Sequence, residues 1–476
     1  MLSIFLFAFC VSSFLLPVTA QVASPAATLG FDDATNVMGL SRQFAESIIN
    51  EYYKKNPLGS STGLFYTKPE PLGGSELPWN VSANIWDTLI TYSNLTGDTQ
   101  FSDLISEALF AQADSPDDTS SFMPRNQTLY LDNPAQAQWG LAALSAAESN
   151  LVPSRRNQRP YFQLADEVFS AQTERWNSSL CNGILRHSIF LFNEGYDQSS
   201  ALGMSSFFLL SARLARFSGN QTYITWAEKA FASAQKVGFI SDKYQVFDRA
   251  DIVDEKCVLD KSSSTSSNLG RWIEGTAVLY NQTNGNETWR THLTSLLNTT
   301  SQFLLTSNAS APLIASDCKA DNALPDCGIH ARLPYIHSLS RIVALAPFTA
   351  AKLNPMLAWT ADAAMSVCTM ISSSIQTNGQ ELEFDFAKAC PNDWSSKNSV
   401  NTSDPLDLTV VTAATALESL QGLLWAMERQ VPQKTGEGNG QNANPDSKQG
   451  GAVHVLSTKL SIAVGGLAMV AMALVL

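Results

Sequence analysis

The chain has 476 residues and a formal net charge of −13, from 30 Lys and Arg against 43 Asp and Glu. Only 15% of its residues are charged, whereas soluble chains average roughly 25%. An acidic chain without a run of Lys or Arg argues against nucleic-acid binding and against a basic membrane-surface helix. A hydrophobic content of 45% excludes a disordered tail, and the length allows one large domain or two ordinary ones.

The first 20 residues are typical of a secretory signal peptide. They contain no charged side chain, and Ile4 to Leu16 is an almost unbroken apolar run. Val18 and Ala20 are small residues at the positions that signal peptidase accepts, which predicts cleavage before Gln21. A membrane anchor is the alternative, although the run is shorter than the roughly 20 residues that a span needs.

The C-terminal end has the pattern of a signal for a glycosylphosphatidylinositol (GPI) anchor. Gln433 to Gln449 is polar and rich in Gly and Asn, as expected of a flexible stalk. The small residues from Gly450 follow, and Leu460 to Leu476 is free of charge. This pattern predicts attachment at Gly450, with Ser447 or Asn444 as alternatives. We therefore expect a protein anchored at the outer face of the plasma membrane or in the cell wall.

These signals divide the chain into four parts. We expect a signal peptide over 1–20, one domain over 21–430, a stalk over 431–450 and an attachment signal over 451–476. Secretion makes ten N-x-S/T sequons candidate glycan sites, and glycans replace charge as a solvating coat. The sequons lie at Asn80, Asn94, Asn126, Asn177, Asn220, Asn281, Asn286, Asn298, Asn308 and Asn401.

Six cysteines remain after removal of the signal peptide, which is an even number in an oxidising compartment. Local pairing predicts Cys318–Cys327 and Cys368–Cys390 and leaves Cys181 with Cys257, although six cysteines permit fifteen connectivities. Zinc binding is the alternative. We expect neither metal nor cofactor, because no C-x-x-C pair exists and histidines such as His187, His330, His337 and His454 are scattered.

Three segments share a Gly, then Asp or Asn, then two residues and an aromatic. They are Gly97-Asp98-Thr99-Gln100-Phe101, Gly219-Asn220-Gln221-Thr222-Tyr223 and Gly285-Asn286-Glu287-Thr288-Trp289. Such a glycine ends one helix in the left-handed conformation, and the Asp or Asn caps the next. Apolar helical periodicity lies on both sides of each segment, which predicts helix–turn–helix joints.

The joints recur with a period near 60 residues. Phe101 and Tyr223 are 122 residues apart, and Tyr161 lies almost midway between them. Leu357 to Trp359 is expected to open another second helix, and Val411 to Met427 to form a last one. About six helix pairs predict an all-α, closed (α/α)6 toroid whose inner-helix N-terminal loops surround a central cleft. An open α-solenoid is the rival; strand-like alternation is rare.

Several segments resemble glycoside hydrolase family 76, the α-1,6-mannan-acting enzymes, and in particular its GPI-anchored fungal cell-wall members. The matching runs are Gln136-Ala137-Gln138-Trp139-Gly140, Ala212 to Asn220, Tyr223 to Lys229, Tyr244 to Asp248, Asn268-Leu269-Gly270 and Leu345 to Thr349. They occur in the family's order between Trp86 and Gln421. The resemblance implies an (α/α)6 barrel and a cleft that accepts α-1,6-linked mannose, in wall mannan or in the core of GPI glycans.

The same resemblance implies two adjacent catalytic aspartates immediately before Gln136. Here these positions are Pro134 and Ala135, which neither transfer a proton nor carry charge. Asp132 is the nearest carboxylate, and a local register shift would supply only this one. A second departure is Met204-Ser205, where the family usually has Asn-Gly before the Phe-Phe pair.

Other candidate residues have both a functional and a structural interpretation. Asp248 and Asp251 could contact a sugar or cap helices, and Trp139 could stack on a sugar or belong to the core. Gln136, Tyr196 and Asn268 are further candidates for sugar binding. Glu274 is expected to face solvent or to pair with Arg271, Asp197 to lie in a cleft loop or an ordinary turn, and His187 to be a satisfied histidine.

Three functional hypotheses follow. The first is a cell-surface protein that binds or acts on α-1,6-mannose glycans in fungal cell-wall or GPI-glycan remodelling, with catalysis weakened or lost. The second is a working hydrolase or transglycosidase that uses Asp132 with another acid such as Asp248. The third is a structural wall glycoprotein that does not bind sugar.

Overall fold

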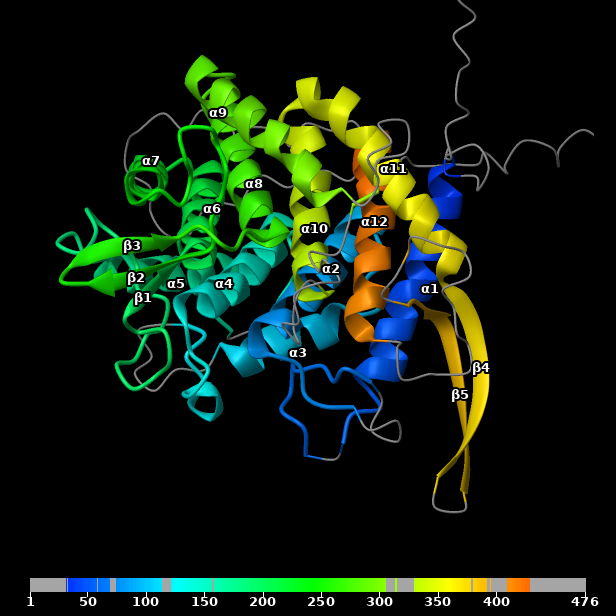
Figure 1. Cartoon of the computed structure of the whole chain (residues 1–476). Coiled ribbons are helices and arrows are strands. Elements are labelled where there is room, and N and C mark those ends of the chain that lie inside the picture. Colours follow the sequence, from blue (N-terminus) through cyan, green and yellow to red (C-terminus); the bar gives the residue numbers. More distant parts are fainter. Residues whose placement is uncertain are drawn as a thin grey trace, which may run out of the picture.

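A computed structural model describes residues 31, 33–57, 59–68, 74–113, 121–155, 158–304, 313–314, 329–377, 380–391, 394 and 409–428. Six helices form an inner ring in these ranges: α2 (Trp79–Thr96), α4 (Asn133–Glu148), α6 (Ala201–Ser218), α8 (Ser266–Gln282), α10 (Ile329–Leu345) and α12 (Val410–Glu428). Each packs against the next, and α12 packs against α2, so the ring is closed. Figure 1 shows these helices grouped about the centre of the molecule.

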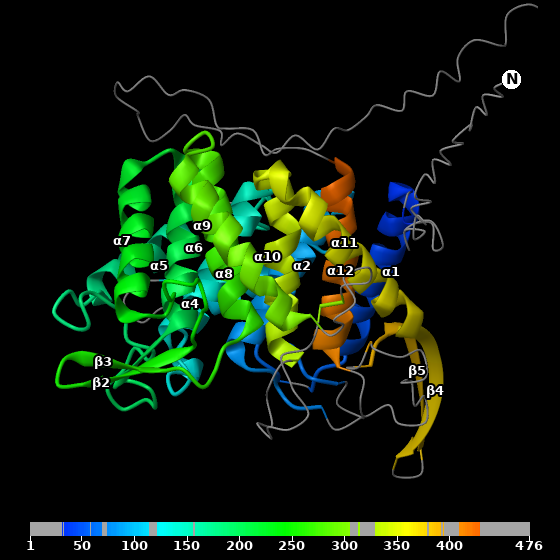
Figure 2. The same ribbon diagram turned by 45° about the horizontal axis from the view of Figure 1, so that its top comes forward.

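Six further helices surround the ring: α1 (Ala34–Tyr52), α3 (Ser102–Gln112), α5 (Tyr161–Arg175), α7 (Gln221–Val237), α9 (Glu287–Asn298) and α11 (Ala350–Val367). The helices α3, α5, α7 and α9 each pack on the inner helix that precedes them, and α11 packs on α10 and α12. The outer partner of α12 is α1, from the other end of the chain (Figure 2). The predicted closed (α/α)6 toroid is thus confirmed, and the open solenoid is wrong.

The second predicted joint has both expected features, and the other two have one each. Phe101, not Asp98, is the N-cap residue of α3, and the C-cap residue of α8 is Thr283, before Gly285. Gly97 and Gly219 end α2 and α6 with φ of 72°. The side chain of Asn220 accepts a hydrogen bond from the backbone N–H of Thr222 at 2.9 Å, as an N-cap does. Tyr161 is the first residue of α5, as its spacing predicts. The expectation for Leu357 to Trp359 is wrong in position, because α11 already begins at Ala350 and these residues lie inside it.

Two small antiparallel sheets were not predicted. The first joins β1 (Gln198–Ser200), β2 (Arg249–Val253) and β3 (Lys256–Asp260) in that order, with Gln198 opposite Asp251. The second is the hairpin of β4 (Thr369–Thr377) and β5 (Gln380–Ala389). Three short 3-10 helices, η3 (Arg125–Gln127), η4 (Thr299–Phe303) and η5 (Pro347–Thr349), complete the described elements.

Buried aromatic side chains pack between the helices of the ring. Trp86, Trp139 and Trp272 are completely buried, and the ring of Trp272 lies 5.1 Å from that of Phe208 on α6. The inner helices approach closely here, since a Cβ added at Gly275 of α8 would lie 2.4 Å from the Phe208 ring. A larger residue at position 275 would therefore force α6 and α8 apart.

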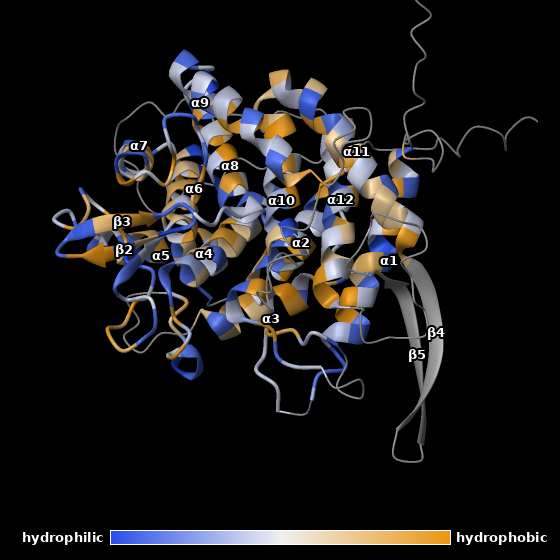
Figure 3. Cartoon of the chain, in the orientation of Figure 1, coloured by the Kyte–Doolittle hydropathy of each residue, from blue (hydrophilic) through white to orange (hydrophobic). Residues whose placement is uncertain are grey.

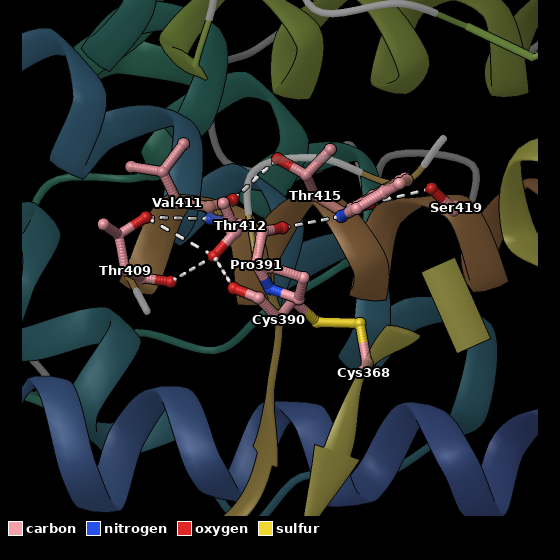
Figure 4. Close-up of a disulfide and its surroundings, with 9 residues drawn as sticks. Cys368, Cys390, Pro391, Thr409, Val411, Thr412, Thr415 and Ser419 are labelled. Atoms are coloured by element: carbon pink, nitrogen blue, oxygen red, sulfur yellow. Dashed lines mark hydrogen bonds between the residues drawn. A yellow bond between two sulfur atoms is a disulfide. The ribbon is translucent and has the colours of Figure 1, made fainter. Parts of the chain in front are cut away.

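Two of the three predicted disulfides are present in the structure. Cys181 is bonded to Cys257 at the edge of the first sheet, and Cys368 to Cys390 at the base of the β4–β5 hairpin. Figure 4 shows the second bond beside α12, where the hydroxyl of Thr412 donates to the carbonyl oxygen of Cys390 at 2.8 Å. Cys318 and Cys327 lie outside the described residues, as do the predicted signal peptide, stalk, attachment signal and Gly450.

Within the described ranges, α12 is long and apolar enough to cross a membrane over Val410–Met427, and α10 with the bent segment after it passes the same test as a pair. Most of α12 is buried against α1, α2, α10 and α11, as expected of a core helix in the ring. Length and apolar composition alone therefore do not make it a membrane span.

The predicted glycan sites differ in exposure. Asn126, Asn177, Asn220, Asn286 and Asn298 are exposed, whereas Asn80, Asn94 and Asn281 are partly buried. The amide nitrogen of Asn281 donates to the carbonyl oxygen of Leu345 at 3.2 Å, a bond that a glycan on this nitrogen would disrupt. Asn308 and Asn401 lie outside the described residues.

Candidate functional site

Backbone hydrogen bonds tie together the segments that lead into three neighbouring inner helices. The N–H of Asn133, at the start of α4, donates to the carbonyl oxygen of His187 at 2.9 Å. The N–H of His187 donates to Gln198 in β1 at 2.7 Å, and that of Ala201, at the start of α6, donates to Asp248 at 2.7 Å. Sites on these segments therefore lie on one face of the ring, which we call the N-terminal face.

Asp132 is the N-cap of α4. Its Oδ1 accepts a hydrogen bond from the N–H of Ala135 at 2.6 Å. Its Oδ2 lies 3.7 Å from Nε2 of His187, whose Nδ1 is 3.0 Å from the hydroxyl of Ser200. Burial raises the pKa of the Asp132 carboxyl, although the charge of His187 and the bond from Ala135 oppose this. One carboxylate in this position can cap a helix or transfer a proton, but glycoside hydrolysis needs a second.

Pro134 and Ala135 occupy the first turn of α4, and both are buried. Pro134 packs toward Gly203, where an added Cβ would lie 3.4 Å from the proline ring. Proline suits this first turn because its missing N–H has no partner there in any case. The two positions that the family resemblance assigns to acids are thus filled by buried apolar side chains.

The structure places Gln136 and Trp139 in the core rather than on the N-terminal face. The amide nitrogen of Gln136 donates to the carbonyl oxygen of Ser121 at 2.9 Å, and its oxygen accepts from Arg175. Trp139 is completely buried against Phe122 and Trp79. The expectation that these two residues contact a sugar is corrected, because neither side chain has a face open to a ligand in this structure.

The carboxylate of Asp248 makes structural hydrogen bonds to the start of α8. Its Oδ1 accepts from the N–H and hydroxyl of Thr265, the N-cap residue of α8, and from the amide nitrogen of Asn268 at 2.7 Å. Asn268 is buried, and its Oδ1 has no hydrogen-bond partner among the described residues. That oxygen is shielded from solvent, so it can accept from a buried water but is closed to a sugar hydroxyl in this structure.

Tyr196 and Asp251 lie beside the contact that Asp248 makes. Asp251 is in β2, and Tyr196 comes two residues before β1. The ring of Tyr196 is covered by the guanidinium of Arg186 at 4.4 Å, and its carbonyl oxygen accepts from that guanidinium. Asp251 is exposed within β2, so it does not cap a helix. Asp197 is also exposed, and its carbonyl oxygen accepts from Ile252. Asp132, Tyr196, Asp248, Asp251 and Asn268 are thus brought onto one face of the ring.

A charged network along the ring axis was missed by the sequence analysis. It contains Asp87, Glu148, Arg213, Arg271, Glu274, His337, Arg341 and Glu418, all on inner helices. Glu274 is buried, not exposed, and its carboxylate lies 3.3 Å from Arg341 and accepts from Ser338 at 2.9 Å. The signal that could have found it is the presence of lone charges inside apolar helices, such as Glu418 within Val410–Met427.

Ion pairs balance the charge of the axial network. Burial opposes ionisation of Glu148, but Arg213 and Arg341 outweigh it and lower its pKa to about 2. Burial would likewise lower the pKa of His337, yet the carboxylates of Glu418 and Asp87 raise it overall. Burial lowers the pKa of Arg271 to about 10. Of the network, Asp87, Arg213, Arg271, Glu274 and His337 line an axial cavity of about 20 Å³, which has room for a water molecule.

No group of three or more His, Cys, Asp or Glu side chains with the geometry of a metal site occurs within the described ranges. The carboxylates on the axis instead face guanidinium groups and an imidazole. These residues do not offer a cation a vacant set of oxygen ligands.

Comparison with known proteins identifies the family to which this architecture belongs. The family model "Glycosyl hydrolase family 76" matches residues 40–434. The chain belongs to this family. Mannan endo-1,6-alpha-mannosidase DFG5 of Saccharomyces cerevisiae is 28% identical over 461 residues, which cover 92% of this chain and 91% of that one.

Two solved structures share the fold. Dfg5 from Chaetomium thermophilum in complex with glucosamine superposes with a TM-score of 0.66 at 24% identity and covers 83% of this chain and 92% of that chain. An inactive variant of the α-1,6-mannanase GH76A of Salegentibacter, with two consecutive aspartates replaced by alanine, was solved in complex with α-1,6-mannotetrose. It has a TM-score of 0.61 at 14% identity and covers 82% of this chain and 98% of that chain.

Proposed function

We propose that this protein binds α-1,6-linked mannose glycans at the fungal cell surface and takes part in cell-wall or GPI-glycan remodelling, with catalysis weakened or lost. The single observation that carries the loss of catalysis is the first turn of α4, where Pro134 and Ala135 are buried and apolar. Without a second carboxylate there, neither a double displacement nor a water-mediated inversion has both of its groups.

Relatives support the glycan class. The S. cerevisiae relative is named a mannan endo-1,6-alpha-mannosidase, and its alignment covers nearly the whole of both chains. The bacterial family member without its two aspartates is inactive but still holds α-1,6-mannotetrose. Binding without turnover is therefore compatible with this fold. In our chain the exposed carboxylate of Asp251 is a group that would meet sugar hydroxyls.

Attachment to the membrane through a GPI anchor at Gly450 completes the proposal. The supporting observation is the sequence after α12, a polar stretch followed by small residues and an uncharged apolar run. Secretion agrees with the two disulfides, which form and persist in oxidising compartments.

The alternative is an active hydrolase or transglycosidase that uses Asp132 as its acid. The raised pKa of Asp132 and the nearby imidazole of His187 favour this second candidate. Asp248, the second acid expected for it, already accepts three hydrogen bonds from Thr265 and Asn268. Its engagement in these bonds weakens the case for a second catalytic group.

The experiment compares the wild type with the double variant Pro134→Asp/Ala135→Asp for binding and hydrolysis of α-1,6-mannotetraose. We expect binding without hydrolysis in the wild type and hydrolysis in the double variant. Pro134→Asn/Ala135→Asn is the matched control, since it has the same shape without the carboxylates. Hydrolysis by the wild type that Asp132→Asn abolishes would overturn the proposal in favour of the alternative. Absence of binding at millimolar ligand would leave a structural wall protein.

A further inference from the structure

Four large apolar side chains project from two loops beside α4. Leu129, Tyr130, Leu191 and Phe192 are each between 67% and 78% exposed. Single exposed apolar residues are ordinary on a protein surface, but a cluster of four on adjoining loops indicates a contact surface. We call these four residues the apolar rim.

Hydrogen bonds hold the two loops together. The amide nitrogen of Asn193 donates to the carbonyl oxygens of Thr128 at 3.0 Å and Leu131 at 3.4 Å. The N–H of Ile189 donates to Leu131 at 3.4 Å, and Asp132 and Ser188 form an antiparallel bridge. The loops therefore form one unit, seen at the lower left of Figure 1 and with hydrophobic colouring in Figure 3.

The rim is held outward rather than collapsed onto the protein. The ring of Phe192 stacks on that of Phe190, with centroids 5.3 Å apart and planes at 6°. Phe190 itself is partly buried against the core. This packing fixes the direction of the tip, so that Leu191 and Phe192 stay in contact with solvent.

The rim borders the candidate site. Leu129 and Tyr130 precede Asp132 by three and two residues, and Leu191 follows His187 by four. Both Asp132 and His187 lie on the N-terminal face. Whatever covers the rim is therefore adjacent to this face and sets its orientation.

The composition of the rim favours a lipid surface. A sugar-stacking platform uses aromatic faces, but Leu129 and Leu191 have none. A stable protein partner needs roughly 1,000 Å² or more of buried area, whereas four side chains supply about a few hundred. Aliphatic and aromatic side chains together on loop tips match the shallow apolar layer at a membrane interface.

The chain between α12 and the expected anchor is long enough to let the N-terminal face turn toward the membrane. Gly450 lies 22 positions after Glu428, the last residue of α12. Fully extended, this stretch reaches about 75 Å. The 19-residue helix α12 is only about 28 Å long, so the stalk can pass the height of the ring.

We propose that the apolar rim inserts into the outer leaflet of the membrane and turns the N-terminal face toward the headgroup layer. This inference rests on the proposed function, because an anchored protein whose ligand is a mannoside near the membrane benefits from facing it. The lipid headgroup layer is where a lipid-linked mannoside would be met.

The test is flotation with phosphatidylcholine vesicles, using the chain that ends at Gly450. This chain keeps every element of the closed ring but lacks the apolar tail. We expect it to float with the vesicles, and Leu129→Ser/Leu191→Ser to lower vesicle binding by about tenfold or more. Val152→Ser is the matched control: Val152 is 77% exposed but follows the other end of α4. It should float as the wild type does.

Failure of the wild type to float, or an equal loss in Val152→Ser, would overturn the inference. So would concentration-dependent dimerisation that the double variant loses, since the rim would then bind a second copy. Binding of α-1,6-mannotetraose is measured on the same samples. Its loss in the double variant would make the rim a sugar site and also overturn the inference. Flotation without any mannoside binding would instead support the rim and refute the proposed function.

Discussion

Nδ1 of His337 lies 3.1 Å from Oε2 of Glu418 and joins α10 to α12 inside the ring. Nε2 of the same imidazole lies 3.6 Å from Asp87 on α2, while Arg341 approaches it from its own helix. The helices α12 and α2 come from opposite ends of the domain and close the ring. His337 therefore connects the two carboxylates across the closing contact.

Replacing His337 with Gln should remove a pH dependence of stability. The pKa of His337 is raised on folding, so its contribution is fully present below the unfolded value of about 6.5 and is lost as pH rises through the folded value. We expect His337→Gln to be destabilised by about 3 kcal/mol at acidic pH and to lack this decline. Denaturant unfolding at several pH values measures this dependence. If the unfolding free energy of His337→Gln changed with pH as that of the wild type does, His337 would not be the group responsible.

Replacing Glu148 with Gln should act at the other end of the pH scale. Its pKa is lowered to about 2, so its contribution is present above the unfolded value of about 4.5 and disappears as pH falls through 2. The shift corresponds to about 3 kcal/mol. We expect Glu148→Gln to be destabilised by about this amount at neutral pH, since Arg213 and Arg341 lose their partner. Thermal unfolding of the wild type and of Glu148→Gln at neutral pH measures the difference. Equal stability of the two proteins would contradict a stabilising role for the ion pairs of Glu148.

The cap at Asp132 can be separated from any chemistry. Asp132→Ala should cost about 1 kcal/mol of stability, because the N–H of Ala135 loses its acceptor. Asp132→Asn keeps an acceptor and should be close to the wild type. Urea unfolding measures both variants. If Asp132→Asn were as unstable as Asp132→Ala, the charge rather than the cap would be what stabilises α4.

The two disulfides should contribute unequally. Cys181–Cys257 closes a loop of 76 residues and Cys368–Cys390 one of 22. The loop-entropy model gives about 4 and 3 kcal/mol respectively. We expect Cys181→Ser/Cys257→Ser to lower the unfolding free energy more than Cys368→Ser/Cys390→Ser. The reverse order would indicate that native contacts of the hairpin base, not the loop length, dominate.

The sequence predicted the toroid because its signals are local. Gly219 and Asn220 end one helix and begin the next through their own backbone and side-chain geometry, and this spacing repeats. Local pairing predicted Cys368–Cys390 and left Cys181 with Cys257, and both of these bonds are present.

The site was only partly predictable because its contacts are long-range. Trp139 precedes a glycine in a family motif, but only the packed structure shows it buried against Phe122 and Trp79. Glu274 pairs with Arg341 of the next inner helix rather than with its neighbour Arg271. The three-stranded sheet at Asp251 joins a short hairpin, β2 and β3, to β1 about 50 residues earlier, without a long alternating pattern.

The most direct test of the central claim is a single NMR experiment on the wild-type protein with α-1,6-mannotetraose. Saturation transfer from protein to sugar reports binding, and the anomeric signals of the same sample report cleavage over time. We predict transfer to the sugar with the tetrasaccharide intact. Appearance of shorter mannosides, or absence of transfer at millimolar ligand, would contradict a binding protein whose catalysis is lost at Pro134 and Ala135.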